Sequence, residues 1–251
     1  MCTVIVLHRP GHGWPLLVAA NRDEKLDRRA DPPGPWWPEY PGLIGGRDRT
    51  AGGTWLAMNP AGVIACILNR PGSLGPAPDK RSRGVLPLLA IARAASAAAA
   101  AELIAGLDAR DWRPFNLVLA DRDGAWFGKG LGAGRPQLSP LAPGLSMVTA
   151  HDPNDLSSPR TARHLPRFQA APAPDPAEQD WLSWENLIAD GGYEHGLNET
   201  LCVPPLGGFG TVSASLIGLP RRGAPVWRFA PGPPGRTAFA PVPLRQTEPR
   251  S

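Results

Sequence analysis

The sequence opens with MCTVIVLHRPGHGWPLLVAANRDEK over residues 1–25. Two apolar runs in this stretch, residues 2–7 and 15–21, are joined by a segment with two glycines, which indicates a turn between paired strands. In such a hairpin the end of the second strand lies beside the start of the first, and neighbouring strands are about 5 Å apart. We therefore expect the polar tetrapeptide at residues 21–24 to lie next to Cys2.

The composition predicts a globular chain with many short elements. The chain has 251 residues, of which 42% are hydrophobic and 19% charged. Its 32 prolines and 29 glycines separate the periodic segments, which argues against long helical bundles and favours short strands. The net charge of +4 comes from dispersed arginines, so we expect no nucleic-acid partner.

The number and spacing of the cysteines, together with the hydropathy of the chain, indicate the cellular compartment. The three cysteines are far apart and form no CxxC pair, which argues against a zinc or other metal site and against a disulfide scaffold. The apolar segment at residues 85–107 carries two charged residues and is mostly alanine, so we expect a helix with no stable membrane insertion. With no cationic leader at the start, these features predict a cytoplasmic protein.

Hydrophobic periodicity predicts antiparallel sheets covered by helices. We expect strand pairs at residues 2–7 with 15–21, 52–58 with 63–69, 115–120 with 125–130, and 210–220 with 224–232. We expect helices at residues 85–107, 158–168 and 175–190. The proline-rich residues 31–42 are predicted to form a loop, because proline cannot donate to a strand ladder.

The position of Cys2 suggests a nucleophile. Removal of Met1 would leave a residue with both a thiol and a free α-amine, and such an amine can act as the base for its own nucleophile. A guanidinium at Arg22 would lower the pKa of the thiol, and a neighbouring carboxylate would orient the amine. The alternatives are a small apolar side chain at Cys2 and a solvated turn with local salt bridges at residues 21–24.

Several blocks of this sequence, in order, resemble the NRDE family, which includes the transport and Golgi organisation protein 2 homologues of animals. The blocks are MC, AANRDE, GGTW, LNRPG, SRGVL and FNLVLAD in the first half, with GFGTVSAS as a looser match later. The resemblance implies a single domain over residues 1–251 with the fold of the N-terminal nucleophile (Ntn) hydrolases. That fold is an α+β, four-layer αββα sandwich, in which two antiparallel sheets are flanked by helices.

The resemblance also implies roles for individual residues. Cys2 would be the nucleophile, Arg22 and Asp23 would support the thiol and the amine, and Asn69 would donate to the oxyanion. The residues expected to contact a substrate are Asn21, Glu24, Trp55, Asn116 and Thr211. Structural alternatives stay open for three of them: a tight turn at Trp55, a loop cap at Asn116 and sheet packing at Thr211.

Two functions follow from these residues. The first is a cysteine hydrolase or acyltransferase that acts on an amide-type C–N bond of a small-molecule substrate and needs no cofactor. The second is a non-catalytic carrier of a hydrophobic ligand, either haem or an acyl lipid, since the animal homologues are linked to haem trafficking. The sequence leaves the substrate and the oligomeric state open.

Overall fold

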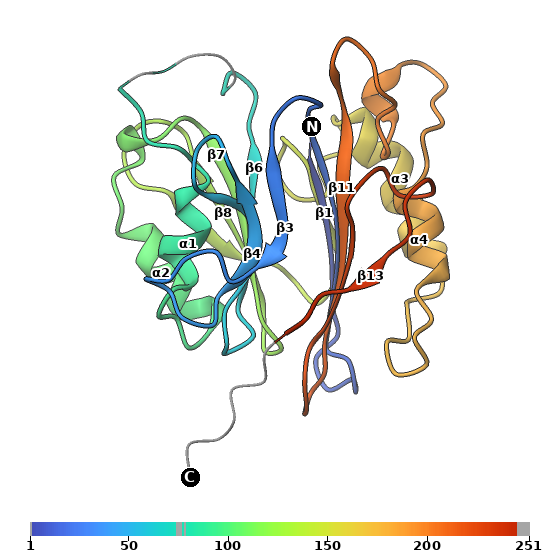
Figure 1. Cartoon of the computed structure of the whole chain (residues 1–251), viewed down its shortest axis with the longest axis horizontal. Helices are drawn as coiled ribbons and strands as arrows, with labels where there is room; N and C mark the ends of the chain where they lie inside the picture. The colour runs from blue at the N-terminus through green and yellow to red at the C-terminus, as the bar shows by residue number, and fades with distance from the viewer. Residues whose placement is uncertain (1, 74–76, 78, 245–251) are drawn as a thin grey trace.

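The computed structural model describes residues 2–73, 77 and 79–244 and arranges them in four layers (Figure 1). Two β-sheets stack face to face in the middle. Helices α1 (Val85–Ile91) and α2 (Ala97–Ala105) cover the outer face of one sheet, and helices α3 (Pro159–Ala170) and α4 (Leu182–Ile188) cover the outer face of the other. The predicted αββα arrangement is confirmed.

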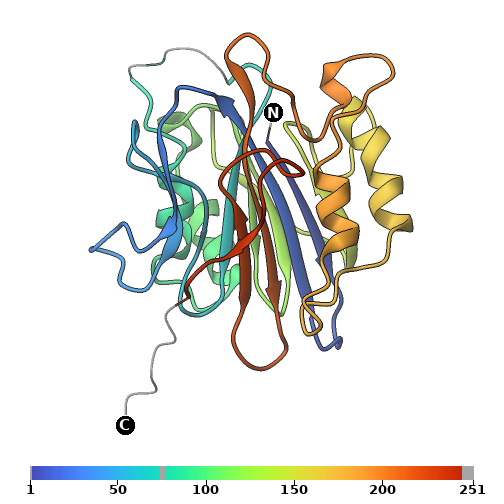
Figure 2. The ribbon, with the colours of Figure 1, turned by 45° about the vertical axis from the view of Figure 1, so that its right-hand side comes forward.

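The sheet next to α3 and α4 has six antiparallel strands in the order β10-β1-β2-β11-β12-β13. Its central strands come from opposite ends of the chain, as the turned view in Figure 2 shows. The strands are β1 (Thr3–His8), β2 (Leu16–Lys25), β10 (Gly144–Val148), β11 (Phe209–Leu219), β12 (Val226–Ala230) and β13 (Ala240–Pro241).

The sheet next to α1 and α2 has seven antiparallel strands that follow one another in sequence order. They are β3 (Ala30–Gly34), β4 (Ile44–Asp48), β5 (Thr54–Met58), β6 (Ile64–Asn69), β7 (Phe115–Ala120), β8 (Ala125–Gly130) and β9 (Gln137–Pro140). All four predicted strand pairs are present as hairpins.

The alternation of β1 decides which layer each side chain enters. Val4 and Val6 pack into the core between the two sheets, whereas Ile5 packs toward α3 and α4. The hairpin register pairs Thr3 with Asn21, so the two strands are aligned from the first residue of β1 onward. This register places residue 22 of β2 close to the start of the chain.

The proline-rich loop prediction is wrong at its beginning. Residues 30–34 form the edge strand β3, which pairs with β4. The pairing is irregular between Asp31 and Gly34, and the two prolines fall in this interval. An edge strand tolerates proline because one side of it needs no ladder hydrogen bonds.

The single helix predicted at residues 85–107 is two helices. The side-chain amide of Asn59 donates to the carbonyls of Ile91 and Ala94 at 2.7 and 2.8 Å and so satisfies groups at the end of α1. Ser96 then caps α2 by accepting from the backbone N–H of Ala99. Together these bonds explain the break in the alanine-rich segment.

The other two predicted helices differ in how well their bounds match. Helix α3 begins after Ser158, whose hydroxyl accepts from the backbone N–H of Thr161, as the sequence predicts. Helix α4 begins only at Leu182, because Asp175 and Asp180 form an isolated antiparallel bridge. Among the described residues, no helix has both the length and the apolar character needed to cross a bilayer.

Candidate functional site

Cys2 lies just before β1 and faces the space between the two sheets. The residue is half-buried and packs against the inter-sheet core. Its Sγ donates to the backbone carbonyl of Asp23 at 3.6 Å, a contact that follows from the hairpin register. The thiol and the tetrapeptide are therefore neighbours, as the sequence predicts.

Arg22 is the member of the tetrapeptide whose side chain enters the same space. Its guanidinium carbon lies 4.3 Å from the centroid of the Trp55 ring on β5, and its side chain is only 7% exposed. Nη2 of Arg22 lies 4.0 Å from a carboxylate oxygen of Glu24, and this separation makes a weak ion pair. Gly46 packs directly against the indole, because a Cβ there would lie 2.2 Å from the ring. Arg22 is thus held by stacking on a ring that is itself fixed in place.

Burial affects the pKa of the Cys2 thiol more than the charge of Arg22 does. Burial is the main reason that the pKa of the thiol is raised, and the Asp23 carboxylate adds to the increase. Arg22 lowers the pKa, as expected, but its effect is smaller. The resting thiol is consequently protonated at neutral pH, so a nucleophilic attack would need a base.

Asp23 lies in β2 next to Arg22, but its side chain lies on the opposite face of the sheet, toward α3. One carboxylate oxygen accepts from Arg160 at 2.9 Å, and the other accepts from the Thr211 hydroxyl at 2.6 Å. Arg160 also donates to the Thr3 hydroxyl at 2.9 Å. The side chains of Asp23 and Arg160 are 0% and 2% exposed. This buried network ties β1, β2 and β11 to helix α3.

Asn21 lies on the same outer face as Asp23. Its amide nitrogen donates to the carbonyls of Ile188 and Leu201 at 2.9 and 3.0 Å. Ile188 is the last residue of α4, so Asn21 fastens that helix to the sheet. The observed contacts of Asn21 and Thr211 are to the protein itself, and their predicted contacts to a substrate stay predictions.

The two asparagines of the second sheet lie near the same end of the sandwich. Asn69 ends β6, and the alternation of that strand places it on the face of Ala65, toward α1 and α2. Asn116 on β7 donates both amide hydrogens, to the carbonyls of Thr149 and His151 at 2.9 and 2.8 Å. A substrate contact from the Asn116 amide would require one of these bonds to break.

Sequence reasoning missed Arg160, although a signal for it was present. The buried face of α3 carries Arg160, Thr161 and His164 beside Leu165 and Phe168. An arginine within the buried stripe of an amphipathic helix requires a buried carboxylate as its partner. Asp23 is that partner, although the two residues are 137 positions apart.

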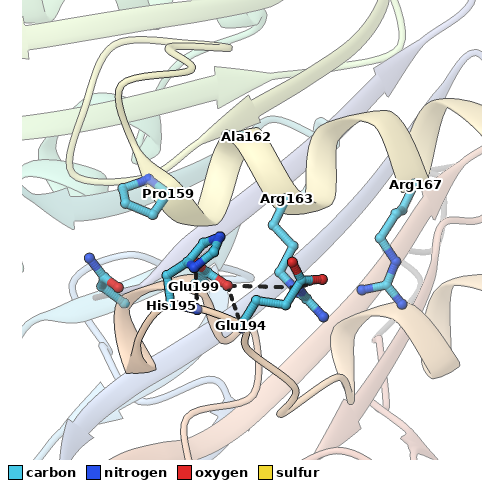
Figure 3. Close-up of a pocket in the computed structure, with 8 residues that line it drawn as sticks. Pro159, Ala162, Arg163, Arg167, Glu194, His195 and Glu199 are labelled. Atoms are coloured by element: carbon cyan, nitrogen blue, oxygen red, sulfur yellow. Dashed lines mark hydrogen bonds and ion pairs between the residues drawn. The ribbon is translucent and has the colours of Figure 1, made fainter.

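Two cavities lie on the α3 and α4 side of the molecule. The larger, about 770 Å³, lies against α3 (Figure 3). It is lined by Pro159, Ala162, Arg163, Arg167, Glu194, His195, Asn198 and Glu199. Its charges are mutually compensated, since Arg163 pairs with Glu194 and Glu199. The smaller, about 390 Å³, is lined in part by Cys202 and by prolines. Cys2 lines neither cavity.

The described part of the chain contains no group of three or more His, Cys, Asp or Glu side chains arranged to hold a metal ion. All three cysteines are free thiols in the structure. The groups that the structure places together between the sheets are the Cys2 thiol and the stacked Arg22 guanidinium.

The fold and the cysteine before its first strand define the class as a scaffold of the N-terminal nucleophile hydrolase type. Within that class, the family model described as "Transport and Golgi organisation 2" matches residues 1–154. The chain belongs to this family. A search of curated proteins finds no match.

Two solved structures show the likeness of fold. The first is an N-acylethanolamine-hydrolyzing acid amidase ortholog from Caenorhabditis elegans, with a TM-score of 0.58 and 12% identity, over 88% of this chain and 94% of that one. The second is a C2A mutant of the conjugated bile acid hydrolase from Clostridium perfringens, with a TM-score of 0.51 and 9% identity, over 98% of both chains. At these identities the similarity concerns the fold alone.

Proposed function

We propose that the chain is an N-terminal-cysteine hydrolase or acyltransferase that acts on an amide-type C–N bond of a small molecule. The observation that carries the proposal is that the Cys2 thiol and the stacked Arg22 guanidinium lie in the same space between the sheets, close enough for Arg22 to lower the pKa of the thiol. The fold supports it, because two structural neighbours are described as an acid amidase and a bile acid hydrolase.

The proposed reaction begins with removal of Met1, which frees the α-amine of Cys2. The amine takes the thiol proton while sulfur attacks the substrate carbonyl, and a tetrahedral oxyanion forms. The amine then gives that proton to the leaving nitrogen, the C–N bond breaks, and the acyl group stays on sulfur as a thioester. Water or an acceptor amine attacks the thioester, which returns the proton and the free thiol.

The groups around the thiol support the α-amine as the base and Arg22 as the group that stabilises negative charge. Because burial raises the pKa of the Cys2 thiol, proton removal must accompany the attack, and the α-amine is the nearest proposed base. Arg22 would stabilise negative charge on sulfur or on the oxyanion from a position fixed by Trp55. Glu24 and Trp55 remain proposed substrate contacts, whereas the oxyanion role of Asn69 stays a prediction, since the alternation of β6 directs Asn69 toward α1 and α2.

The test is acylation of Cys2 in the purified full-length protein. Intact mass first establishes whether Met1 is absent. A p-nitrophenyl ester of a medium-chain acid is then added, and peptide mapping locates the acyl group. We expect acyl transfer to Cys2, no transfer in Cys2→Ala, and a rate at least about tenfold lower in Arg22→Gln. Cys202→Ser is the matched thiol control and should behave as wild type.

Two outcomes would end this proposal. Retention of Met1 leaves Cys2 without a free amine, so the proposed base would not exist. Equal acylation of the wild type and of Cys2→Ala would place the reactive group elsewhere.

A carrier function is the second candidate, because burial raises the pKa of the Cys2 thiol and so opposes formation of a nucleophilic thiolate. The ligand would be haem or an acyl lipid held on the same scaffold. Titration with haemin and with a fluorescent fatty acid tests this alternative. Binding that is unchanged in Cys2→Ala, together with no acylation of the wild type, would support a carrier.

We also propose a reducing, cytoplasmic location, in keeping with three free thiols.

A further inference from the structure

Two arginines from separate segments converge on one buried carbonyl group. Arg83, just before α1, donates from Nη1 to the carbonyls of Ser73 and Pro114, both at 3.1 Å. Arg113 donates from Nη1 to the same Ser73 carbonyl at 2.9 Å. Ser73 is fully buried, so the two guanidinium groups are brought together at a fixed point.

Neither arginine forms an ion pair among the residues that the structure describes. No carboxylate in the part of the chain that the structure describes lies within 4.0 Å of Arg83 or Arg113, whereas the neighbouring Arg28 and Arg70 are paired with Asp48 and Asp152. Burial lowers the pKa of Arg83, and the positive charge of Arg113 lowers it further. The charge of Glu24 acts on Arg83 from beyond ion-pair distance, and its influence on the pKa of Arg83 is smaller than that of Arg113. Two half-buried like charges in this arrangement repel each other, and a bound anion would relieve the repulsion.

Both guanidinium groups retain donors for such an anion. A guanidinium has five N–H donors, and in both residues only Nη1 is used within the described chain. The remaining nitrogens of Arg83 and Arg113 are not among the buried atoms that lack a partner, so solvent reaches them. A planar set of open donors matches the oxygens of a carboxylate or phosphate group.

This arginine pair is linked to the Cys2 site through backbone contacts. The carbonyl of Gly84 accepts from the N–H of Thr54 at 2.8 Å, and Gly53 packs so closely that a Cβ there would lie 2.4 Å from Gly84. The residue after Thr54 is Trp55, on which Arg22 is stacked. Arg83 is also close enough to Cys2 for the negative charge of a thiolate there to act on it, and this charge partly opposes the lowering of the Arg83 pKa.

We propose that Arg83 and Arg113 form an anion subsite that binds an oxyanion group, carboxylate or phosphate, of the molecule whose acyl portion reaches Cys2. The amide substrate is then an acidic one, such as an N-acyl amino acid, and neutral amides of equal chain length bind less well. The substrate part of this inference rests on the proposed hydrolase function. The anion subsite itself also applies to a carried ligand.

Binding to full-length Cys2→Ala protein tests the subsite without turnover. Isothermal titration would compare N-lauroylglycine, dodecyl phosphate and the neutral N-lauroylethanolamine. We expect one or both anionic probes to bind at least about tenfold more tightly than the neutral amide, and the better probe identifies the anion. The double change Arg83→Gln and Arg113→Gln should abolish this preference. Arg135→Gln, at an exposed arginine, is the matched control and should retain it.

A second variant distinguishes loss of the anion subsite from loss of the folded structure. Arg83→Lys with Arg113→Lys keeps the charges and should keep part of the preference, at a melting temperature close to that of the parent. Equal affinity for anionic and neutral probes would overturn the subsite. A preference for anionic probes that survives the double Gln change would also overturn the subsite. The absence of binding by both anionic probes would overturn it as well. Anion preference without cleavage of N-lauroylglycine by the wild type would support the subsite and reject the hydrolase.

Discussion

Replacement of Arg160 by methionine tests the buried network that joins the sheet to α3. The change preserves much of the side-chain volume but removes the guanidinium from Asp23 and Thr3, whose contacts with it are both 2.9 Å. Breaking a buried ion pair costs about 3–5 kcal/mol, because one charge stays in a dry environment. For a chain of this size that corresponds to a melting temperature lower by roughly 10 °C.

A double-mutant cycle measures the interaction directly. Arg160→Met, Asp23→Asn and the double variant would be unfolded with denaturant and followed by circular dichroism at constant pH. We expect each single change to be strongly destabilising. We expect the double variant to lose at least about 2 kcal/mol less than the sum of the two single losses, since it removes both members of the buried ion pair. Additive losses, or single losses below about 1 kcal/mol, would refute the reasoning.

Two further predictions concern packing and pH. Gly53→Ala should cost about 1–3 kcal/mol, because the new methyl group meets the Gly84 backbone, whereas Gly13→Ala, with open space around it, should be nearly neutral in the same denaturant assay. Burial lowers the pKa of His164 to about 4 from an unfolded value of about 6.5, so the unfolded chain binds more protons between these values. Stability should fall by up to about 3 kcal/mol as the pH drops from 6.5 to 4, and a His164→Gln variant should show a flatter pH dependence over that range.

The elements that could be predicted from the sequence are those specified by local patterns. Each predicted hairpin combines two apolar runs with a turn, and the structure contains all four. The placement of the thiol beside residues 22 and 23 follows from the first of them. The start of α3 was equally local, since it depends on one serine and the proline after it.

The elements that could not be predicted depend on distant partners. The break between α1 and α2 is stabilised by Asn59, which comes 32 residues before Ile91 in the sequence. The pairing of Asp23 with Arg160 spans 137 residues. The strand at β3 tolerates its prolines only because it lies at the edge of the sheet, and the edge is a property of the whole fold. No local pattern carries this information.

The tetrapeptide at residues 21–24 combines two tasks because successive residues of a strand face opposite ways. Arg22 enters the space between the sheets, where it can act on Cys2. Asn21 and Asp23 point to the helical layer and hold α4 and α3 in place. Loss of Arg22 should therefore alter the reactivity of the thiol with little loss of stability, whereas loss of Asn21 or Asp23 should loosen the helical layer. A four-residue motif of this kind does not by itself imply that all four side chains contact a substrate.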